Sequence, residues 1–162
     1  MQSEMRNSWL MLADDKFARD CSFHAFRAGG PGGQKQNKTS SAVRLVHNPT
    51  GISAEAAESR SRNENLAKAI KKLKLNIACE IRNTFKLLHF QMKINPSNPV
   101  YSLWMAEILD ALEICEFRVS DAAEKLGIST GQLVKILEKE PLLWQKTNQK
   151  RISRNLPPLK TH

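Results

Sequence analysis

The chain has 162 residues, a length that predicts one ordinary domain or two small ones and disfavours a large multidomain enzyme. With 41% apolar and 25% charged residues, its composition is that of a globular protein rather than a disordered or collagenous one. Its 25 basic and 16 acidic residues leave a net charge of +9, which favours a polyanionic partner such as a nucleic acid.

The charge is segregated along the chain. Residues 1–98 carry 16 basic and 8 acidic side chains, residues 99–144 carry 4 and 8, and residues 145–162 carry 5 and none. No apolar run is long enough to span a bilayer, and the first residues lack the order of a secretory signal. The three cysteines have no metal-ligand or disulfide-framework spacing. We therefore expect a cytoplasmic monomer with no membrane partner, no metal and no cofactor.

Period-two patterns predict a small antiparallel sheet in the first third of the chain. A short helix over 10–19 precedes a strand over 21–26, and β-branched residues predict a second strand over 42–47. The Asn-Pro-Thr-Gly sequence at 48–51 predicts a turn, after which residues 52–56 form the third strand of the sheet.

From residue 66 the period changes to about 3.6, which predicts one long amphipathic helix over 66–92 or two joined end to end. Prolines 96 and 99 end the pattern, so residues 95–99 are the expected linker. For the basic face of the helix, contact with RNA and a solvated surface are both open. Its cations are Lys68, Lys71, Lys72, Lys74 and Arg82.

The spacing of apolar residues over 100–144 predicts three short helices. Ser120 is the expected cap of the second, Ser129 and Gln132 fit a capping box for the third, and the Leu-Gly-Ile-Ser turn at 126–129 resembles a helix-turn-helix unit. A structural bundle and direct recognition of nucleic acid both remain open, and the net charge of 99–144 favours a protein partner or a spacer. Its expected core comprises Trp104, Ile108, Leu112, Leu126, Leu133, Ile136 and Leu137. The basic segment 145–162, with its Pro-Pro pair, is expected to be disordered in isolation.

Residues 28–34, between the first two strands, hold four of the seven glycines. Such a stretch is typical of a flexible hinge. Here it ends in Gln34 and is followed by polar and basic residues. Because its glycines carry no side chains, its backbone can enter a narrow site. The four histidines are scattered, so we expect no histidine base or ligand.

The run Arg-Ala-Gly-Gly-Pro-Gly-Gly-Gln at 27–34 is followed by Asn-Lys at 37–38 and Ser-Ala-Val-Arg at 41–44. This series resembles the peptidyl-tRNA hydrolysing domain of class I peptide chain release factors and the short ribosome-rescue hydrolases, whose hallmark is Gly-Gly-Gln. The likeness continues through the hairpin at 47–52 and a helix entry with Arg60, Ser61, Asn65 and Ala69, and covers about residues 12–80. Gln36 and Arg62 depart from the family pattern.

The resemblance implies catalytic roles for Gly32, Gly33 and Gln34. The Gln34 backbone N–H would stabilise charge on the ester carbonyl, its side chain would orient water, and the glycines would permit the close approach. The expected partners are the ribosome, its RNA and peptidyl-tRNA. The residues expected to contact RNA are Arg27, Lys35, Lys38, Arg44, Arg60 and Arg62, with Lys146, Lys150, Arg151 and Arg154 of the basic tail.

The sequence thus predicts an α+β protein in which a small antiparallel sheet packs with a long helix and a helix-turn-helix-like unit follows. The expected divisions are a hydrolase domain at 1–94, a linker at 95–99, a helical unit at 100–144 and a tail at 145–162. The expected function is ribosome-dependent, codon-independent hydrolysis of peptidyl-tRNA, which rescues stalled ribosomes, because no codon-reading domain is found in these 162 residues. The alternative is a ribosome- or RNA-binding protein without hydrolytic activity.

Overall fold

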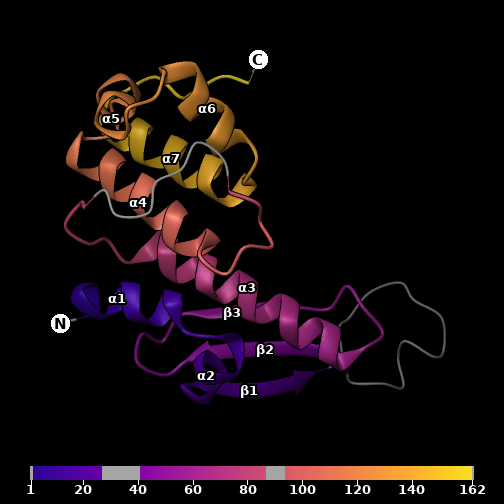
Figure 1. The fold of residues 1–162 in the computed structure, drawn as a ribbon. Helices are drawn as coiled ribbons and strands as arrows, with labels where there is room; N and C mark the ends of the chain where they lie inside the picture. Colours follow the sequence, from indigo (N-terminus) through magenta and orange to yellow (C-terminus); the bar gives the residue numbers. More distant parts are fainter. Residues whose placement is uncertain (1, 27–40, 87–93, 162) are drawn as a thin grey trace. The chain divides into compact units, whose positions relative to one another are not determined.

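The computed structural model describes residues 2–26, 41–86 and 94–161. The chain divides into two compact units, Met1–Ile81 and Arg82–His162. The first unit combines strands and helices, and the described part of the second contains helices but no strand (Figure 1). The architecture is α+β, as the sequence predicts.

The first unit is built on a three-stranded antiparallel sheet. Strands β1 (Cys21–Phe26), β2 (Ala42–His47) and β3 (Ser53–Ala56) lie in the order β1-β2-β3. The turn between β2 and β3 places Gly51 at φ +70°, a conformation that favours glycine, and its N–H donates to the His47 carbonyl at 2.8 Å. The first two strands are as predicted, and the third begins one residue later than expected.

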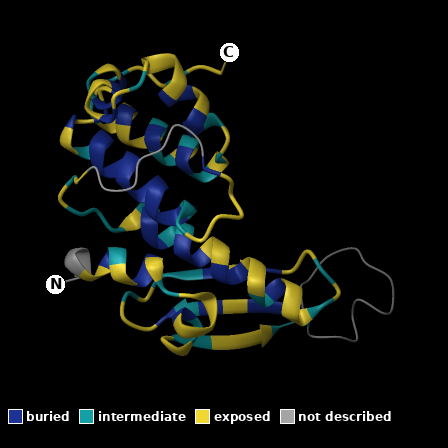
Figure 2. Cartoon of the chain, in the orientation of Figure 1, coloured by how far each residue is buried: buried dark blue, intermediate teal, exposed yellow. Residues whose placement is uncertain are grey.

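Helix α3 (Arg62–Glu80) packs on β2 and β3 and covers one face of the sheet (Figures 1 and 2). Its Ile70, Leu73 and Ile77 are buried, as are Val43 and Leu45 on the strands. Burying each large apolar side chain stabilises the unit by about 1.5–3 kcal/mol, so this interface contributes substantially to its stability. The helix begins after Ser61, whose side chain accepts from the Glu64 N–H.

The prediction that this helix extends to residue 92 is wrong for residues 81–86, and residues 87–92 lie outside the described residues. Helix α3 ends at Glu80, and Ile81 is extended at φ −101° and ψ 116°. Beyond it, the buried carboxylate of Asp110 accepts from the Asn83 backbone N–H at 3.0 Å and from Arg82 Nη1 at 3.2 Å. The Asn83 N–H thus donates to a side chain instead of to a carbonyl one turn earlier, as it would in a continuing helix.

Two helices replace the single one predicted over 10–19: α1 (Gln2–Met11) and α2 (Asp14–Arg19). Between them the Leu12 carbonyl accepts from Lys74 Nζ at 2.7 Å, and the Asp14 carboxylate accepts from the same ammonium at 2.7 Å. Lys74 is buried and lies 5.2 Å from the centre of the Phe17 ring. It is therefore a core cation rather than part of the exposed basic face that the sequence predicted.

The second unit contains α4 (Tyr101–Ile114), α5 (Val119–Leu126), α6 (Thr130–Glu138) and α7 (Pro141–Ser153). All the apolar side chains predicted as its core are buried. No described helix of the chain has the length and apolar character needed to cross a membrane.

The turns of this unit follow their local sequence only in part. Ser129 and Gln132 form the predicted capping box at the start of α6, and Gly127 ends α5 in the left-handed region at φ +69°. The predicted cap by Ser120 is wrong, because α5 already begins at Val119 and the Ser120 hydroxyl donates to the Asp121 carboxylate.

The sequence predicts that segment 145–162 is disordered in isolation. In the structure α7 continues to Ser153, and the chain then folds back along this helix. Asn148 and Leu159 exchange side-chain and backbone hydrogen bonds, and the Leu156 N–H donates to the Arg151 carbonyl at 2.9 Å. Helix α7 has weak apolar periodicity, and its buried Leu143 and these hydrogen bonds hold it in place.

His47 is a buried imidazole in the core of the first unit. Its ring stacks on Phe17 at a centroid distance of 5.2 Å and meets the edge of Trp9 at 4.9 Å. Nδ1 lies 2.9 Å from the Thr50 hydroxyl, and Nε2 has no hydrogen-bond partner among the described residues. Burial lowers the pKa of His47 below its usual 6.5, and the charge of Asp20 opposes part of that shift.

The stability of the protein should therefore fall as the pH drops below the ordinary histidine pKa of about 6.5. The unfolded chain binds a proton at His47 at a higher pH than the folded chain does, so acid favours unfolding. The free energy of unfolding should decrease by up to about 1.4 kcal/mol per pH unit in this window. Urea denaturation between pH 7.5 and pH 5 measures it.

His47→Gln should flatten this pH dependence, whereas His24→Gln, at an exposed position on β1, should leave it unchanged. An unchanged acid slope in the His47 variant would show that other groups control the stability in this range.

Candidate functional site

The two strands that flank the glycine-rich stretch are paired at the point where it leaves the sheet. Phe26, the last residue of β1, is the cross-strand partner of Ala42, the first of β2. Six predicted site residues lie between them in the sequence and fall outside the described residues: Arg27, Gly32, Gly33, Gln34, Lys35 and Lys38. The hairpin therefore brings the two ends of the segment that carries Gly-Gly-Gln next to each other.

A buried asparagine lies at the same end of the sheet. The side chain of Asn65, in the second turn of α3, is fully buried. Its amide nitrogen donates to the Ser41 carbonyl and to the Ser59 carbonyl, each at 2.8 Å, and its oxygen accepts from the Ser59 N–H at 2.9 Å. The segment that leads into α3 is thus joined to the residue that immediately precedes β2.

Arg60 and Arg62 are exposed at this helix entry, one on each side of Ser61. Arg44 is exposed on β2, where its Nε lies 3.6 Å from the carboxylate of Glu55, its cross-strand partner on β3. Both members of this pair are about half exposed, so the ion pair contributes little to stability and Arg44 can exchange partners. The three described arginines predicted to meet RNA in this unit are therefore accessible.

The lysines of α3 have different environments. Lys68 and Lys71 are exposed. Lys72 forms an ion pair with Glu58, and its ammonium also donates to the Glu55 carbonyl at 3.2 Å. The hydrogen bond from Lys72 lowers the pKa of Glu58. Among the four lysines of α3, Lys74 alone is buried, and Lys72 is exposed but already paired with Glu58.

The tail residues predicted to bind RNA also differ from one another. Arg151 is buried, and its guanidinium donates to the Phe117 carbonyl at 2.5 Å and to the Pro157 carbonyl at 2.9 Å. The prediction that Arg151 binds RNA is wrong in this fold, because both contacts are internal. Lys150 is exposed and Lys146 is half-buried.

Arg154 is half-buried and partly engaged. Its Nη2 donates to the Glu113 carboxylate at 2.7 Å, and its guanidinium carbon lies 4.8 Å from the centre of the Phe117 ring. Phe117 and the preceding Glu116 both have positive φ, at 61° and 52°, a backbone conformation that costs about 1–3 kcal/mol per non-glycine residue. Arg151 and Arg154 both contact Phe117 and so stabilise this strained turn.

No group of histidine, cysteine and carboxylate side chains with the arrangement of a metal site occurs among the described residues. Burial, aided by the charge of Asp20, raises the pKa of Cys21 to about 11, so this thiol is protonated at neutral pH. The remaining described cysteines, Cys79 and Cys115, are unbonded by disulfides.

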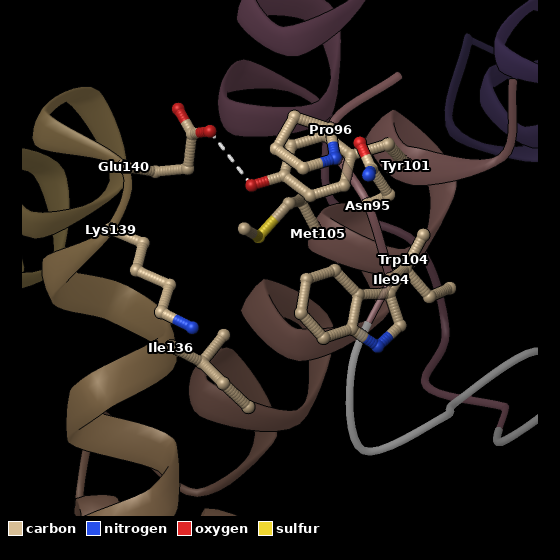
Figure 3. A pocket seen from close by; sticks show the side chains of 9 residues that line it. All are labelled: Ile94, Asn95, Pro96, Tyr101, Trp104, Met105, Ile136, Lys139 and Glu140. Atoms are coloured by element: carbon tan, nitrogen blue, oxygen red, sulfur yellow. Dashed lines mark hydrogen bonds between the residues drawn. The ribbon is translucent and has the colours of Figure 1, made fainter. Parts of the chain in front are cut away.

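The second unit contains a cavity of about 350 Å³ (Figure 3). Its wall is mainly apolar, and at one side the Tyr101 hydroxyl donates to the Glu140 carboxylate at 2.7 Å. Burial and this bond raise the pKa of Tyr101. Asn95 and Pro96, from the segment predicted as a linker, line the cavity too, so that segment packs within the helical unit.

Comparison with known families finds two matches in the chain. Residues 17–91 match the model of the RF-1 domain. This match confirms the resemblance found in the sequence.

Individual relatives give the same assignment. The chain is 53% identical over 58 residues to peptide chain release factor 1 of Paracidovorax citrulli, covering 36% of this chain and 16% of the relative. It is 39% identical over 90 residues to peptide chain release factor 2 of Buchnera aphidicola, covering 56% and 24%. It is 34% identical over 121 residues to peptide chain release factor 1 of Chlamydia abortus, covering 74% and 32%. The chain thus spans a third or less of the length of these relatives.

Residues 105–139 match a second model, bacterial regulatory protein of the Fis family. The match runs from within α4 through α6 and includes the turn at Gly127. It confirms the helix-turn-helix resemblance of this unit.

Three polar side chains have structural roles that sequence reasoning did not identify. The sequence predicts Lys74 and Arg151 as surface cations, and it places Asn65 only within the family-like helix entry. Lys74 does have a signal in the sequence, because it follows the apolar Leu73 and precedes Ile77 by three residues, close to the buried face. The partners of Asn65 and Arg151 are backbone groups, which no sequence pattern identifies.

Arg151→Ala should destabilise the helical unit by about 2–4 kcal/mol, because it leaves two inward-facing carbonyls without their donor. Lys150→Ala, at the exposed neighbouring position, should change the free energy of unfolding by less than about 0.5 kcal/mol. Chemical denaturation followed by tryptophan fluorescence compares the two. Equal stability of the two variants would contradict the internal role of Arg151.

Proposed function

We propose that this protein hydrolyses the ester bond between a nascent peptide and tRNA on the ribosome, without reading a codon, and thereby rescues stalled ribosomes. The observation that carries the proposal is the position of Gly32, Gly33 and Gln34 within an RF-1 domain, in the connection between paired strands β1 and β2. Relatives named as peptide chain release factors support a role in translation termination on the ribosome.

The reaction needs water held beside the ester carbonyl and a donor for the oxygen on which negative charge develops. The Gln34 backbone N–H supplies the donor in this proposal, the Gln34 side chain orients the water, and Gly32 and Gly33 allow the backbone to approach the ester closely. Water adds to the carbonyl carbon, the bond to the ribose oxygen breaks, and that oxygen takes a proton as the peptide leaves as a carboxylate. Positioning supplies most of the rate enhancement.

Codon independence is proposed because residues 105–139, in the helical second unit, match a different family from residues 17–91. Segment 99–144 carries 4 basic and 8 acidic residues, so contact with a protein fits it better than general attraction to phosphate. We propose that this unit selects the stalled complex through a protein contact.

The proposed RNA contacts are the accessible cations. Arg44, Arg60 and Arg62 are exposed in the first unit, and Lys150 is exposed in the second. Arg27, Lys35 and Lys38 retain the role that the family resemblance implies, and Lys146 and Arg154 are further candidates. Each phosphate contact should make binding more sensitive to salt.

Gly33→Ala should reduce peptide release at least about 100-fold, because an added Cβ displaces the backbone at the reacting ester. The measurement is release of labelled peptide from ribosomes that hold peptidyl-tRNA and an empty decoding site, with ribosome binding measured separately by sedimentation. Gly131→Ala is the matched control, because open space surrounds the position where its Cβ would lie. Equal release by the Gly33 variant and the unmodified protein would refute the catalytic assignment.

The same assay tests codon independence when a stop codon or a sense codon occupies the decoding site. Release confined to stop-codon complexes would show a codon-reading factor instead. Ribosome binding without release in any complex would support the alternative, a binding protein without hydrolytic activity.

Free peptidyl-tRNA should not be hydrolysed above background, because the proposed site has no general base or nucleophile of its own and depends on ribosomal positioning. Incubation of the protein with purified peptidyl-tRNA, with and without ribosomal subunits, measures this dependence. Rapid turnover without ribosomes would point to a self-contained mechanism.

A further inference from the structure

Asn65 is the only fully buried side-chain amide among the described residues, and it makes three short hydrogen bonds, all to backbone groups. Two are donated to carbonyls, those of Ser41 and Ser59, and one is accepted from the Ser59 N–H. A neutral amide is the small side chain that provides both donors and an acceptor at one point, so neither aspartate nor leucine can satisfy these three groups.

The two hydrogen-bond partners of Asn65 lie at the end of one segment and at the start of another. Ser41 follows directly on residues 27–40, which include Gly-Gly-Gln, and precedes Ala42, the first residue of β2. Ser59 lies two residues before Ser61, the N-cap of α3. Asn65 therefore ties the end of the glycine-rich segment to the start of the longest helix of the unit.

The other end of that segment has a different anchor. Phe26 is held in β1 by its pairing with Ala42, so strand pairing fixes where the segment begins. The Ser41 carbonyl lies outside the paired registers of β1 with β2 and of β2 with β3. The Asn65 amide supplies its donor and so anchors the residue that precedes the return of the chain to the sheet.

We propose that Asn65 is a positioning residue for peptide release: its amide holds Ser41, just after the segment that carries Gly-Gly-Gln in the sequence, against the entry of α3. This inference rests on the proposed function. Because Asn65 is buried and its hydrogen bonds go to backbone groups of this chain, its loss should affect the maximal rate of release and leave ribosome affinity nearly unchanged.

Asn76 separates this role from a general contribution to stability. It lies three turns further along the same helix, and its amide donates to the Ser53 carbonyl at 2.8 Å, at the first residue of β3. Both asparagines thus connect α3 to a backbone carbonyl at the start of a strand, by bonds of the same length. Only Asn65 is connected to the segment that carries Gly-Gly-Gln.

The test compares Asn65→Ala, Asn65→Asp and Asn76→Ala in the full chain, at a temperature where circular dichroism shows each to be folded. Release is measured on stalled ribosomes across a range of protein concentrations, which separates the maximal rate from the half-saturating concentration. Both Asn65 variants should lose about 10–100-fold in maximal rate, as expected for a displacement of about 1 Å, with half-saturation changed less than about threefold. Asn76→Ala should retain the maximal rate of the unmodified protein.

If Asn65→Ala does not fold, Asn65→Gln keeps the amide and displaces it by one methylene, and the same loss in maximal rate is expected of it. Maximal rates equal to that of the unmodified protein in the folded Asn65 variants, or equally reduced in Asn76→Ala, would overturn the positioning role. Absence of release by the unmodified protein would instead refute the proposed function, so the two failures are distinguishable.

Discussion

The antiparallel pairing of β1 with β2 is the constraint on which the account of the first unit depends. It places Phe26 opposite Ala42, so a segment of fifteen residues leaves and re-enters the sheet at neighbouring positions. Such a hairpin can present a glycine-rich backbone only if the sheet beneath it is rigid. Helix α3 provides that rigidity, because its apolar face is buried on β2 and β3.

The net positive charge has more than one physical role. Lys74 and Arg151 are buried and donate to backbone carbonyls, where they close a helix junction and a strained turn. Their cost of burial is offset by hydrogen bonds that a neutral side chain could not make in the same number. Arg44, Arg60 and Arg62 remain at the surface of the first unit. The positive charge exposed on the described residues is thus smaller than the sequence total, and part of it lies on β2 and at the entry of α3.

Local pattern was sufficient to predict the strands, the capping box at Ser129 and the core of the helical unit. Each depends on residues close in sequence, by alternation, by an i to i+3 hydrogen bond or by helical spacing. The end of α3 was not predictable in this way, because the carboxylate that takes the Asn83 N–H belongs to Asp110. The fold of the C-terminal segment likewise depends on the distant Phe117 carbonyl. The motif series indicated the candidate site, but the tether at Asn65 required the backbone positions of Ser41 and Ser59.

We propose above all that a water molecule oriented by Gln34 cleaves the peptidyl-tRNA ester on the ribosome. The most direct measurement is peptide release in water labelled with a heavy oxygen isotope, followed by mass spectrometry of the peptide. The account predicts that each released peptide gains one heavy oxygen in its terminal carboxylate, that intact deacylated tRNA remains, and that Gly33→Ala suppresses both products. Unlabelled peptide, peptide that leaves still attached to tRNA, or labelled release that Gly33→Ala does not change would contradict it.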